Sequence, residues 1–400
     1  MEFEKYMAKR AIPLKASGIR EMFKLMADPA IISLAGGSPD PELFPCEYLA
    51  EVSAKILREN GKKALAYGTT DGYAPLKEKL IGMAKKKNSF NADEDKIIVT
   101  TGAQQGIDLA ARVLVEDDEC VVVESPSFVG TLNSLRSVRA KLIGVPMEQD
   151  GMDMELLEKT LKENKVKLIY TIPNFQNPAG ITMSAEKRKK LLELAEKYDV
   201  LILEDNPYGD LRFSGEDVPT IKSIDKSGRV IYVGSLSKIL SPGLRIGYVV
   251  ARGELCDKIE IVKQVNDVHT PCLTQMIAAE FLDSYDVDAH IKKACEVYGR
   301  KCRFMQDCME KYFPKGVTWT KPEGGLFILV YCPDCIDTKE LSMEAVKKYK
   351  VAFVPCNNFE TDMDAKTSSL RLNYSTMPEE KIEEGIKAIG ALLKEKLENN

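Results

Sequence analysis

The chain has 400 residues, of which 44% are hydrophobic, so it is long enough to form about two globular domains with sizeable cores. Its net charge of −5 comes from acidic and basic residues that are well mixed, which argues against the basic surface of a nucleic-acid-binding protein. No apolar run is long enough to cross a bilayer, and the N-terminal residues have mixed charge without the apolar core of a secretory signal.

The N-terminal segment, residues 1–45, is predicted to form an arm rather than a domain. Apolar residues recur at helical spacing in 17–26, and a short strand is expected at 31–34. The strand leads into residues 35–40, a loop in which glycine lets the backbone approach a ligand closely. A plain tight turn at Gly37 is the alternative interpretation.

The large domain is expected to begin at residue 46. A buried strand, residues 96–100, feeds into a helix that opens within the small-residue stretch 101–110. Backbone N–H groups at such a helix start lie at the positive end of the helix dipole and can seat a phosphate. This turn is common in α/β proteins, but combined with the lysine and arginine described below it predicts a phosphate at Ala103 and Gln104.

Three further strands are expected before residue 206, and the turn after each carries a side chain with possible chemistry. The strands and these side chains are 120–124 with Phe128, 166–171 with Asn177, and 200–203 with Asp205. Asp205 is thereby placed at the C-terminal edge of a strand, where open parallel sheets bind their ligands. Core packing of Phe128, simple turn chemistry at Asn177 and an acidic loop at Asp205 are the alternatives.

Residues 230–248 give the strongest chemical signal. An apolar run from Val230 to Val233 predicts a buried strand, and the turn after it contains Ser235, Ser237 and Lys238. Arg245 follows seven residues after the lysine. This set suits an aldehyde cofactor with a phosphate, because the amine can form a Schiff base while the hydroxyls and the guanidinium hold the dianion.

The C-terminal part is predicted to contain two helices and then three strands, at 272–283, 287–312, 324–330, 351–355 and 369–375. The last strand places Arg371 among apolar neighbours. A guanidinium in such surroundings needs an anion that accepts two parallel hydrogen bonds, and the α-carboxylate of an amino acid is one. A carboxylate of the protein itself is the alternative partner.

The ten cysteines lack the spacing of a disulfide framework. They are therefore expected to be reduced thiols, which predicts a cytoplasmic protein. Cys332 and Cys335 form a CxxC pair, but a metal site would require a second close pair or several histidines. The chain has only two histidines, so we expect loop thiols and predict no metal site.

The run Ser235-Leu236-Ser237-Lys238, followed by Pro242-Gly243-Leu244-Arg245, resembles the lysine signature of class I and II pyridoxal-phosphate aminotransferases, the fold-type I enzymes. The interval of seven residues from Lys238 to Arg245 is similar to that of the 2-aminoadipate, kynurenine and aromatic aminotransferase subgroup. The resemblance covers nearly the whole chain and implies pyridoxal 5'-phosphate as the cofactor. It also implies an α/β fold with a large domain (46–285) built on a mostly parallel sheet between helices. A small α+β domain (286–400) follows, and the arm packs with it.

The resemblance further implies what several residues do around the cofactor. Asp205 faces the pyridine nitrogen and keeps it protonated, while Tyr208 and Asn177 hydrogen-bond the phenolic oxygen. Phe128 stacks on the ring, at a position where this subgroup often has a tyrosine, so a hydroxyl contact is lost. Tyr67 reaches across a homodimer to the neighbour's cofactor phosphate, so the active sites are shared.

For the substrate, the resemblance implies that Gly37 and Asn177 lie beside the amino acid whose carboxylate Arg371 binds. Arg20, on the arm helix, either meets an acidic substrate side chain or is an ordinary solvated residue. The sequence leaves both possibilities open, and it does not identify the amino donor.

Three functions follow from these residues. The first is an aminotransferase that moves the amino group of an amino acid (2-aminoadipate, aromatic, branched or other) to a 2-oxo acid such as 2-oxoglutarate in a ping-pong cycle, with Lys238 as the proton carrier. The second is a β-lyase or another reaction on the same fold. The third is a ligand-sensing regulator, which is least favoured because such proteins carry a DNA-binding module that we do not expect before this arm.

Overall fold

The computed structural model describes residues 3–8, 10–12, 28 and 30–398. Its main feature is an eight-stranded sheet with the order β2-β9-β8-β7-β6-β3-β4-β5. In that order the strands are Asp95–Thr101, Ile246–Arg252, Val230–Ser235, Leu201–Asn206, Val166–Thr171, Cys120–Ser125, Lys141–Glu148 and Gly151–Met152. The five strands from β8 to β4 are mutually parallel. In contrast, β9 is antiparallel to both β2 and β8, and β5 is antiparallel to β4.

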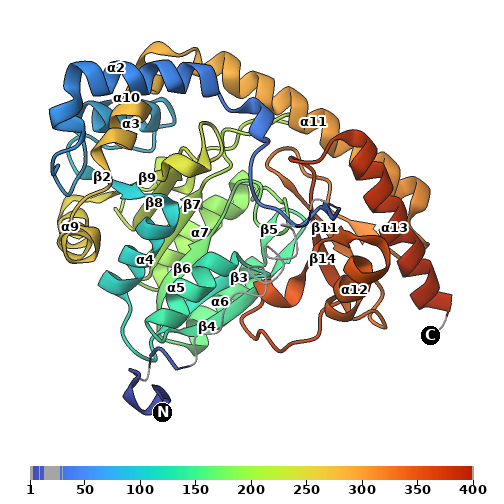
Figure 1. Cartoon of the computed structure of the whole chain (residues 1–400). Helices are drawn as coiled ribbons and strands as arrows, with labels where there is room; N and C mark the ends of the chain where they lie inside the picture. Colours follow the sequence, from blue (N-terminus) through green and yellow to red (C-terminus); the bar gives the residue numbers. More distant parts are fainter. Residues whose placement is uncertain (1–2, 9, 13–27, 29, 399–400) are drawn as a thin grey trace.

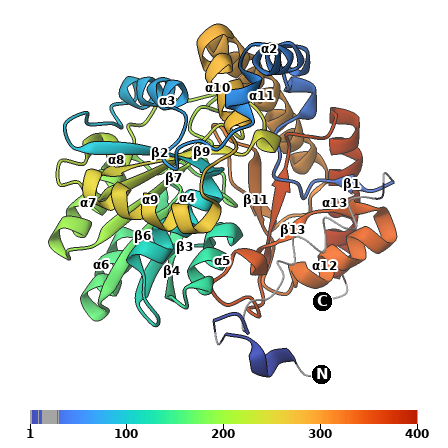
Figure 2. The same ribbon diagram turned by 60° about the vertical axis from the view of Figure 1, so that its left-hand side comes forward.

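Helices cover both faces of this sheet (Figures 1 and 2). Alternate residues of one strand belong to different cores: Leu168 and Tyr170 of β6 pack in one, and Ile169 between them packs in the other. The first core includes α4 (Ala103–Leu114), α5 (Val129–Ser137) and α9 (Gly253–Asp267). The second includes α6 (Met154–Glu163), α7 (Ala185–Lys197) and α8 (Ile221–Ile224). The predicted sheet between helices is therefore confirmed.

Local sequence explains how α7 begins and which face it buries. The side chain of Ser184 accepts a hydrogen bond from the backbone N–H of Lys187 and so caps the helix. Leu191, Leu192 and Leu194 are buried on one side, as their spacing predicts. The helix thereby packs on β7, the strand that carries Asp205.

The remaining helices and a smaller sheet complete the chain. Helices α2 (Cys46–Ala64), α3 (Ala74–Lys86) and α10 (Cys272–Ser284) pack together beside β2. From there the long helix α11 (Val287–Tyr312) runs to the C-terminal region, where it packs on α13 (Glu379–Glu398) (Figure 1). Among the described residues, no helix has the length and apolarity that crossing a bilayer requires.

The C-terminal sheet is antiparallel and has the order β10-β11-β14-β13. These strands are Thr318–Trp319, Phe327–Tyr331, Ser369–Asn373 and Val354–Pro355, and α12 (Thr338–Glu344) packs against β13. Short 3-10 helices lie at Phe3–Tyr6, Pro41–Leu43, Pro242–Leu244 and Cys356–Phe359, and a π-helical turn lies at Ala345–Tyr349. The α/β fold class with a small C-terminal sheet is thus confirmed.

The arm contributes a strand to this C-terminal region. Strand β1 (Ile32–Ser33) pairs in parallel with β12 (Val351–Ala352). The prediction of one continuous strand over 351–355 is therefore wrong. The backbone pairs with the arm up to Ala352 and with β14 from Val354 onward, so the segment divides into two short strands. This division fixes the arm directly beside Arg371 on β14.

Candidate active site

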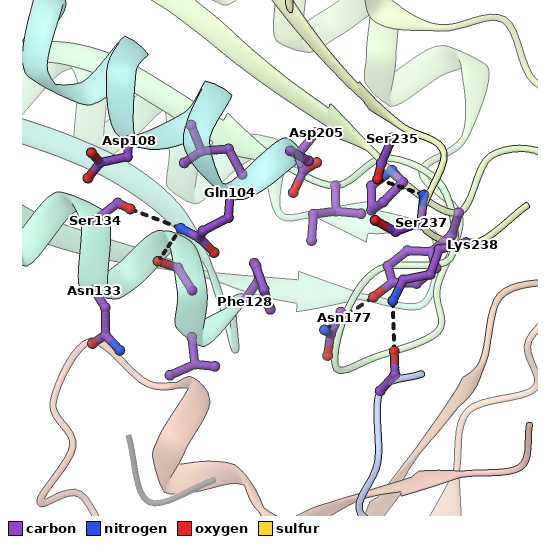
Figure 3. A pocket seen from close by; sticks show the side chains of 18 of the residues that line it. Gln104, Asp108, Phe128, Asn133, Ser134, Asn177, Asp205, Ser235, Ser237 and Lys238 are labelled. Atoms are coloured by element: carbon purple, nitrogen blue, oxygen red, sulfur yellow. Dashed lines mark hydrogen bonds between the residues drawn. The ribbon is translucent and has the colours of Figure 1, made fainter. Parts of the chain in front are cut away.

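A cavity of about 660 Å³ lies at the C-terminal ends of β3, β6, β7 and β8 (Figure 3). Most of the residues predicted from the sequence line it: Gly37, Ala103, Gln104, Phe128, Asn177, Asp205, Tyr208, Ser235, Ser237, Lys238, Arg245 and Arg371. Two other predicted residues remain. Tyr67 is 88% exposed and lies outside the cavity wall, and Arg20 lies outside the described residues.

Lys238 projects into the cavity from the turn after β8. Its Nζ donates a hydrogen bond of 2.8 Å to the carbonyl of Gly37, which belongs to the arm (Figure 3). Burial, with the nearby positive charges of Arg371 and Arg245, lowers the pKa of Lys238 to about 8. An amine with this pKa is partly neutral near neutral pH, which is the form that attacks an aldehyde or accepts a proton.

Asp205 is the penultimate residue of β7 and is 2% exposed. The hydroxyl of Tyr170 donates to its Oδ2 at 2.8 Å, while its Oδ1 has no hydrogen-bond partner among the described residues. Burial raises the pKa of Asp205 to about 7. A buried carboxylate oxygen without a donor is costly, so Oδ1 is suited to a positively charged or N–H-bearing ligand group.

The neighbouring carboxyl group on β7 serves the fold instead. Glu204 points to the opposite face, where its oxygens accept the backbone N–H groups of Ile221 and Lys222 at the start of α8. Alternation along the strand thus separates a structural carboxyl group from one that faces the cavity.

All five predicted phosphate ligands line this cavity: Ala103, Gln104, Ser235, Ser237 and Arg245. The first two lie in the first turn of α4. The backbone here is tightly packed. A Cβ on Gly102, whose φ is +77°, would lie 2.1 Å from an Arg245 nitrogen, and a Cβ on Gly247 would lie 2.4 Å from the N atom of Ala103. Glycines at these two positions therefore allow the guanidinium and the β9 backbone to lie against the helix start.

Gln104 and Phe128 lie on the side of the cavity opposite Lys238 (Figure 3). Nε2 of Gln104 donates to the carbonyl of Gly130 and to Oγ of Ser134, which ties α4 to α5. Because its side chain is engaged in this way, Gln104 has its backbone N–H to offer a phosphate. Phe128 extends across the cavity between Gln104 and Asn177 (Figure 3), where a flat ring could stack.

Arg371 lies at the arm side of the cavity and is 3% exposed. Nη1 donates to Oδ1 of Asn177 at 2.9 Å, and Nη2 donates to the carbonyl of Ala35 at 2.6 Å, while Nε has no partner among the described residues. The ring of Phe327 stacks 4.2 Å from the guanidinium carbon. Within the described residues the guanidinium thus contacts carbonyl and amide oxygens rather than a carboxylate of the protein.

Sequence reasoning missed Tyr170, which contacts Asp205, and Glu124. Glu124 is the penultimate residue of β3, is almost fully buried, and accepts hydrogen bonds from Thr171 and Gln176. Gln176 immediately precedes Asn177, so Glu124 fixes the turn that carries this residue. A polar residue inside an apolar strand was the available signal in both cases, but it does not identify a contact on a different strand.

These residues fit pyridoxal 5'-phosphate. The group has a phosphate for the helix start, a ring nitrogen for the partnerless Oδ1 of Asp205 and an aldehyde for the amine of Lys238. Each of its three polar ends therefore has a matching group, and Phe128 provides a flat side chain for the ring.

Comparison with known proteins agrees with this fit. The family model described as aminotransferase class I and II matches residues 30–389. The chain is 43% identical to aromatic-amino-acid aminotransferase 1 of Thermococcus litoralis, over 99% of this chain and 96% of the relative.

Two crystal structures of similar proteins contain bound derivatives of pyridoxal 5'-phosphate. One is a kynurenine aminotransferase of Pyrococcus horikoshii in complex with PMP, with 42% identity, a TM-score of 0.95, and 99% and 98% of the two chains covered. The other is an alpha-aminoadipate aminotransferase of Thermus thermophilus with N-(5'-phosphopyridoxyl)-L-leucine, with 34% identity, a TM-score of 0.91 and both chains fully covered.

The fold and the cavity define a fold-type I enzyme that works with pyridoxal 5'-phosphate. The chain belongs to the class I and II aminotransferases and transfers amino groups. Its relatives include the aromatic, 2-aminoadipate and kynurenine enzymes, so the subgroup expected from residues 235–247 is confirmed.

Proposed function

We propose that the protein moves the amino group of aromatic amino acids and 2-aminoadipate to 2-oxoglutarate. Arg371 is the observation that supports this proposal. It is a buried guanidinium with a partnerless Nε in the same cavity as Lys238, and it suits the carboxylate that amino acids and 2-oxo acids share. The choice of donors rests on the relatives, whose names refer to aromatic amino acids, 2-aminoadipate and kynurenine.

In this proposal the protein groups divide the work around the cofactor. When bound, pyridoxal phosphate supplies an aldehyde that takes up the amino group and a ring that withdraws electrons from the substrate. Lys238 carries the proton that leaves the substrate Cα. Asp205 holds a proton on the ring nitrogen, and Asn177 and Tyr208 hydrogen-bond the phenolic oxygen.

The remaining assignments are for binding. The phosphate is held by Ala103, Gln104, Ser235, Ser237 and Arg245, and Phe128 stacks on the ring. Gly37 lies over the substrate, whose carboxylate Arg371 binds. Arg20 remains a predicted contact for an acidic substrate side chain.

A panel of amino donors with 2-oxoglutarate tests the function. We expect 2-aminoadipate, kynurenine, phenylalanine and tyrosine each to yield the matching 2-oxo acid together with an equal amount of glutamate. Ammonia released without an acceptor would indicate the β-lyase alternative. No turnover with any donor, while the cofactor stays bound, would favour a ligand sensor.

We also propose a homodimer with shared active sites. Tyr67 stacks edge-on against His269, at 5.7 Å between ring centroids, and it is not among the residues that line the cavity of its own chain. Exposed apolar side chains occur nearby in sequence at Leu65 and Val268. A second copy on this surface would cover them and would bring Tyr67 to the neighbour's phosphate site.

Mixing two defective protomers tests the shared site. In a heterodimer of Lys238→Ala and Tyr67→Phe, one site would combine the intact Lys238 of one chain with the intact Tyr67 of the other. After subunit exchange from an equal mixture, we expect activity of roughly a quarter of wild type beyond the residual activity of the Tyr67→Phe homodimer. No increase after exchange verified by mass spectrometry would contradict the shared site.

Two broader expectations also remain proposals. We place the protein in the cytoplasm because all ten cysteines are free thiols, a state that a reducing compartment maintains. We also retain the division into an arm, a large domain and a small domain. In support, α2 starts at Cys46, and the second boundary falls between α10 and α11.

A further inference from the structure

The environment of Asp205 depends on a single hydrogen-bond donor. Among the described residues only the hydroxyl of Tyr170 donates to this carboxyl group, at 2.8 Å to Oδ2. Both side chains are almost fully buried, with 2% of Asp205 and none of Tyr170 exposed. Without Tyr170 neither carboxyl oxygen would have a donor from the described residues, which is a costly arrangement for a charged group.

Tyr170 is held rigidly by its place in the sheet. It lies on β6, directly beside β7, and its Cα is opposite Leu203, two residues before Asp205. Its ring belongs to the same core as the buried residues of α4 and α5. The hydroxyl of Thr131 on α5 lies next to the Tyr170 hydroxyl and has no partner of good geometry among the described residues, so it is free to donate toward Tyr170.

We propose that Tyr170 is a positioning residue for the aminotransferase reaction: by donating to Oδ2 it keeps Asp205 charged and turns Oδ1 toward the ring nitrogen of the cofactor. Tyr170 touches neither the substrate nor the cofactor in this arrangement, and it acts only through Asp205. The inference rests on the role proposed for Asp205.

The charges around Asp205 agree with this role. Burial raises the pKa of Asp205 to about 7, while the hydrogen bond from Tyr170 and the positive charge of Lys238 lower it. Glu124 on β3 interacts unfavourably with Asp205, and Tyr208 also faces it. Burial, with the negative charge of Asp205, raises the pKa of Tyr170 well above its ordinary value, so its hydroxyl keeps its proton near neutral pH.

The experiment compares Tyr170→Phe, Asp205→Asn and the double variant. Three quantities are measured for each: the dissociation constant of pyridoxal phosphate, the pH dependence of the absorption of the bound cofactor, and the rate of the half-reaction with an amino donor. We expect Tyr170→Phe to weaken cofactor binding and slow the half-reaction by about tenfold or more, the range for loss of a hydrogen bond to a charged group. The pH at which the absorption of the bound cofactor changes should also shift, in the same direction as in Asp205→Asn.

The double variant separates the two roles. If Tyr170 acts through Asp205, Tyr170→Phe should add little once Asp205 is Asn. The proposal would be overturned if Tyr170→Phe had the same effect in the wild-type enzyme as in Asp205→Asn. A Tyr170→Phe enzyme with wild-type absorption and cofactor affinity would also overturn it. An Asp205→Asn enzyme with wild-type rates would instead overturn the role of Asp205, which is a different failure.

Tyr374→Phe is the matched control. Tyr374 is also fully buried, and its hydroxyl donates to the carbonyl of Gly324 in the C-terminal region. Its loss should lower the unfolding temperature without moving the cofactor absorption. If Tyr170→Phe fails to fold, Thr131→Val tests the same chain of donors, and it should shift the absorption in the same direction by a smaller amount. An unchanged absorption in Thr131→Val would then count against the proposal.

Discussion

Replacement of Lys238 by alanine is expected to lower the half-reaction rate by about ten-thousandfold, the upper range for loss of a general acid–base group. The side chain is the amine in the cavity that lies within hydrogen-bond distance of the arm carbonyl of Gly37. Its pKa is lowered to about 8, so part of the amine is neutral near neutral pH. Single-turnover spectroscopy with an amino donor measures this rate directly.

Two controls make this prediction specific. Lys238→Arg keeps a positive charge but has no amine that becomes neutral in this pH range, so it should be nearly as slow as the alanine variant. Borohydride reduction of the wild-type holoenzyme, followed by peptide mapping, should attach the cofactor to Lys238 and to no other lysine. A label elsewhere, or a fast Lys238→Ala half-reaction, would show that another residue carries the proton.

Much of the fold and the site could be predicted because local signals and the sheet edge agree. Apolar runs ending in polar turns predicted the parallel strands, and their common edge brings Asp205 and Lys238 into one cavity. Small residues in 101–110 similarly predicted a helix start at this edge of the sheet, and Ala103 at the start of α4 lines the cavity. These features depend on residues close together in sequence.

Contacts between distant segments could not be predicted in this way. The hydrogen bond from Tyr170 to Asp205 joins two strands, and its existence depends on their register. The division of 351–355 into β12 and β13 depends on the arm strand, which supplies the partner for β12. Apolar periodicity gives the type of each element, but it does not determine which element pairs with which.

The arm loop illustrates how such distant contacts assemble the substrate side of the cavity. Asp40 forms a buried ion pair with Lys301 of α11, at 2.7 Å. Ser375, after β14, donates to the carbonyl of Ser38. These contacts hold the loop in place while its carbonyls at 35 and 36 accept hydrogen bonds from Arg371. A substrate carboxylate would therefore meet a guanidinium that is already fixed in orientation.

This arrangement predicts the effect of Arg371→Ala on both substrates of the cycle. Burial lowers the pKa of Arg371 only to about 10, so the guanidinium stays charged at the working pH. Losing one partner of a buried charge pair costs about 2–5 kcal/mol, which corresponds to roughly a thirtyfold to several-thousandfold loss in kcat/KM. Because every amino donor and oxo acceptor has the α-carboxylate, we expect similar losses for 2-aminoadipate, phenylalanine and 2-oxoglutarate.

Arg371→Lys is the matched variant, since it keeps the charge but loses the planar fork and the donor to Asn177. It should recover part of the activity and remain clearly below wild type. Thermal unfolding of each variant, with cofactor bound, separates loss of binding from loosening of the arm loop.

Arg20→Ala provides the contrast, because it should lower kcat/KM for acidic donors and spare phenylalanine and leucine. If Arg371→Ala instead changes the ratio of acidic to neutral donors while Arg20→Ala weakens all donors equally, the two arginines have exchanged roles.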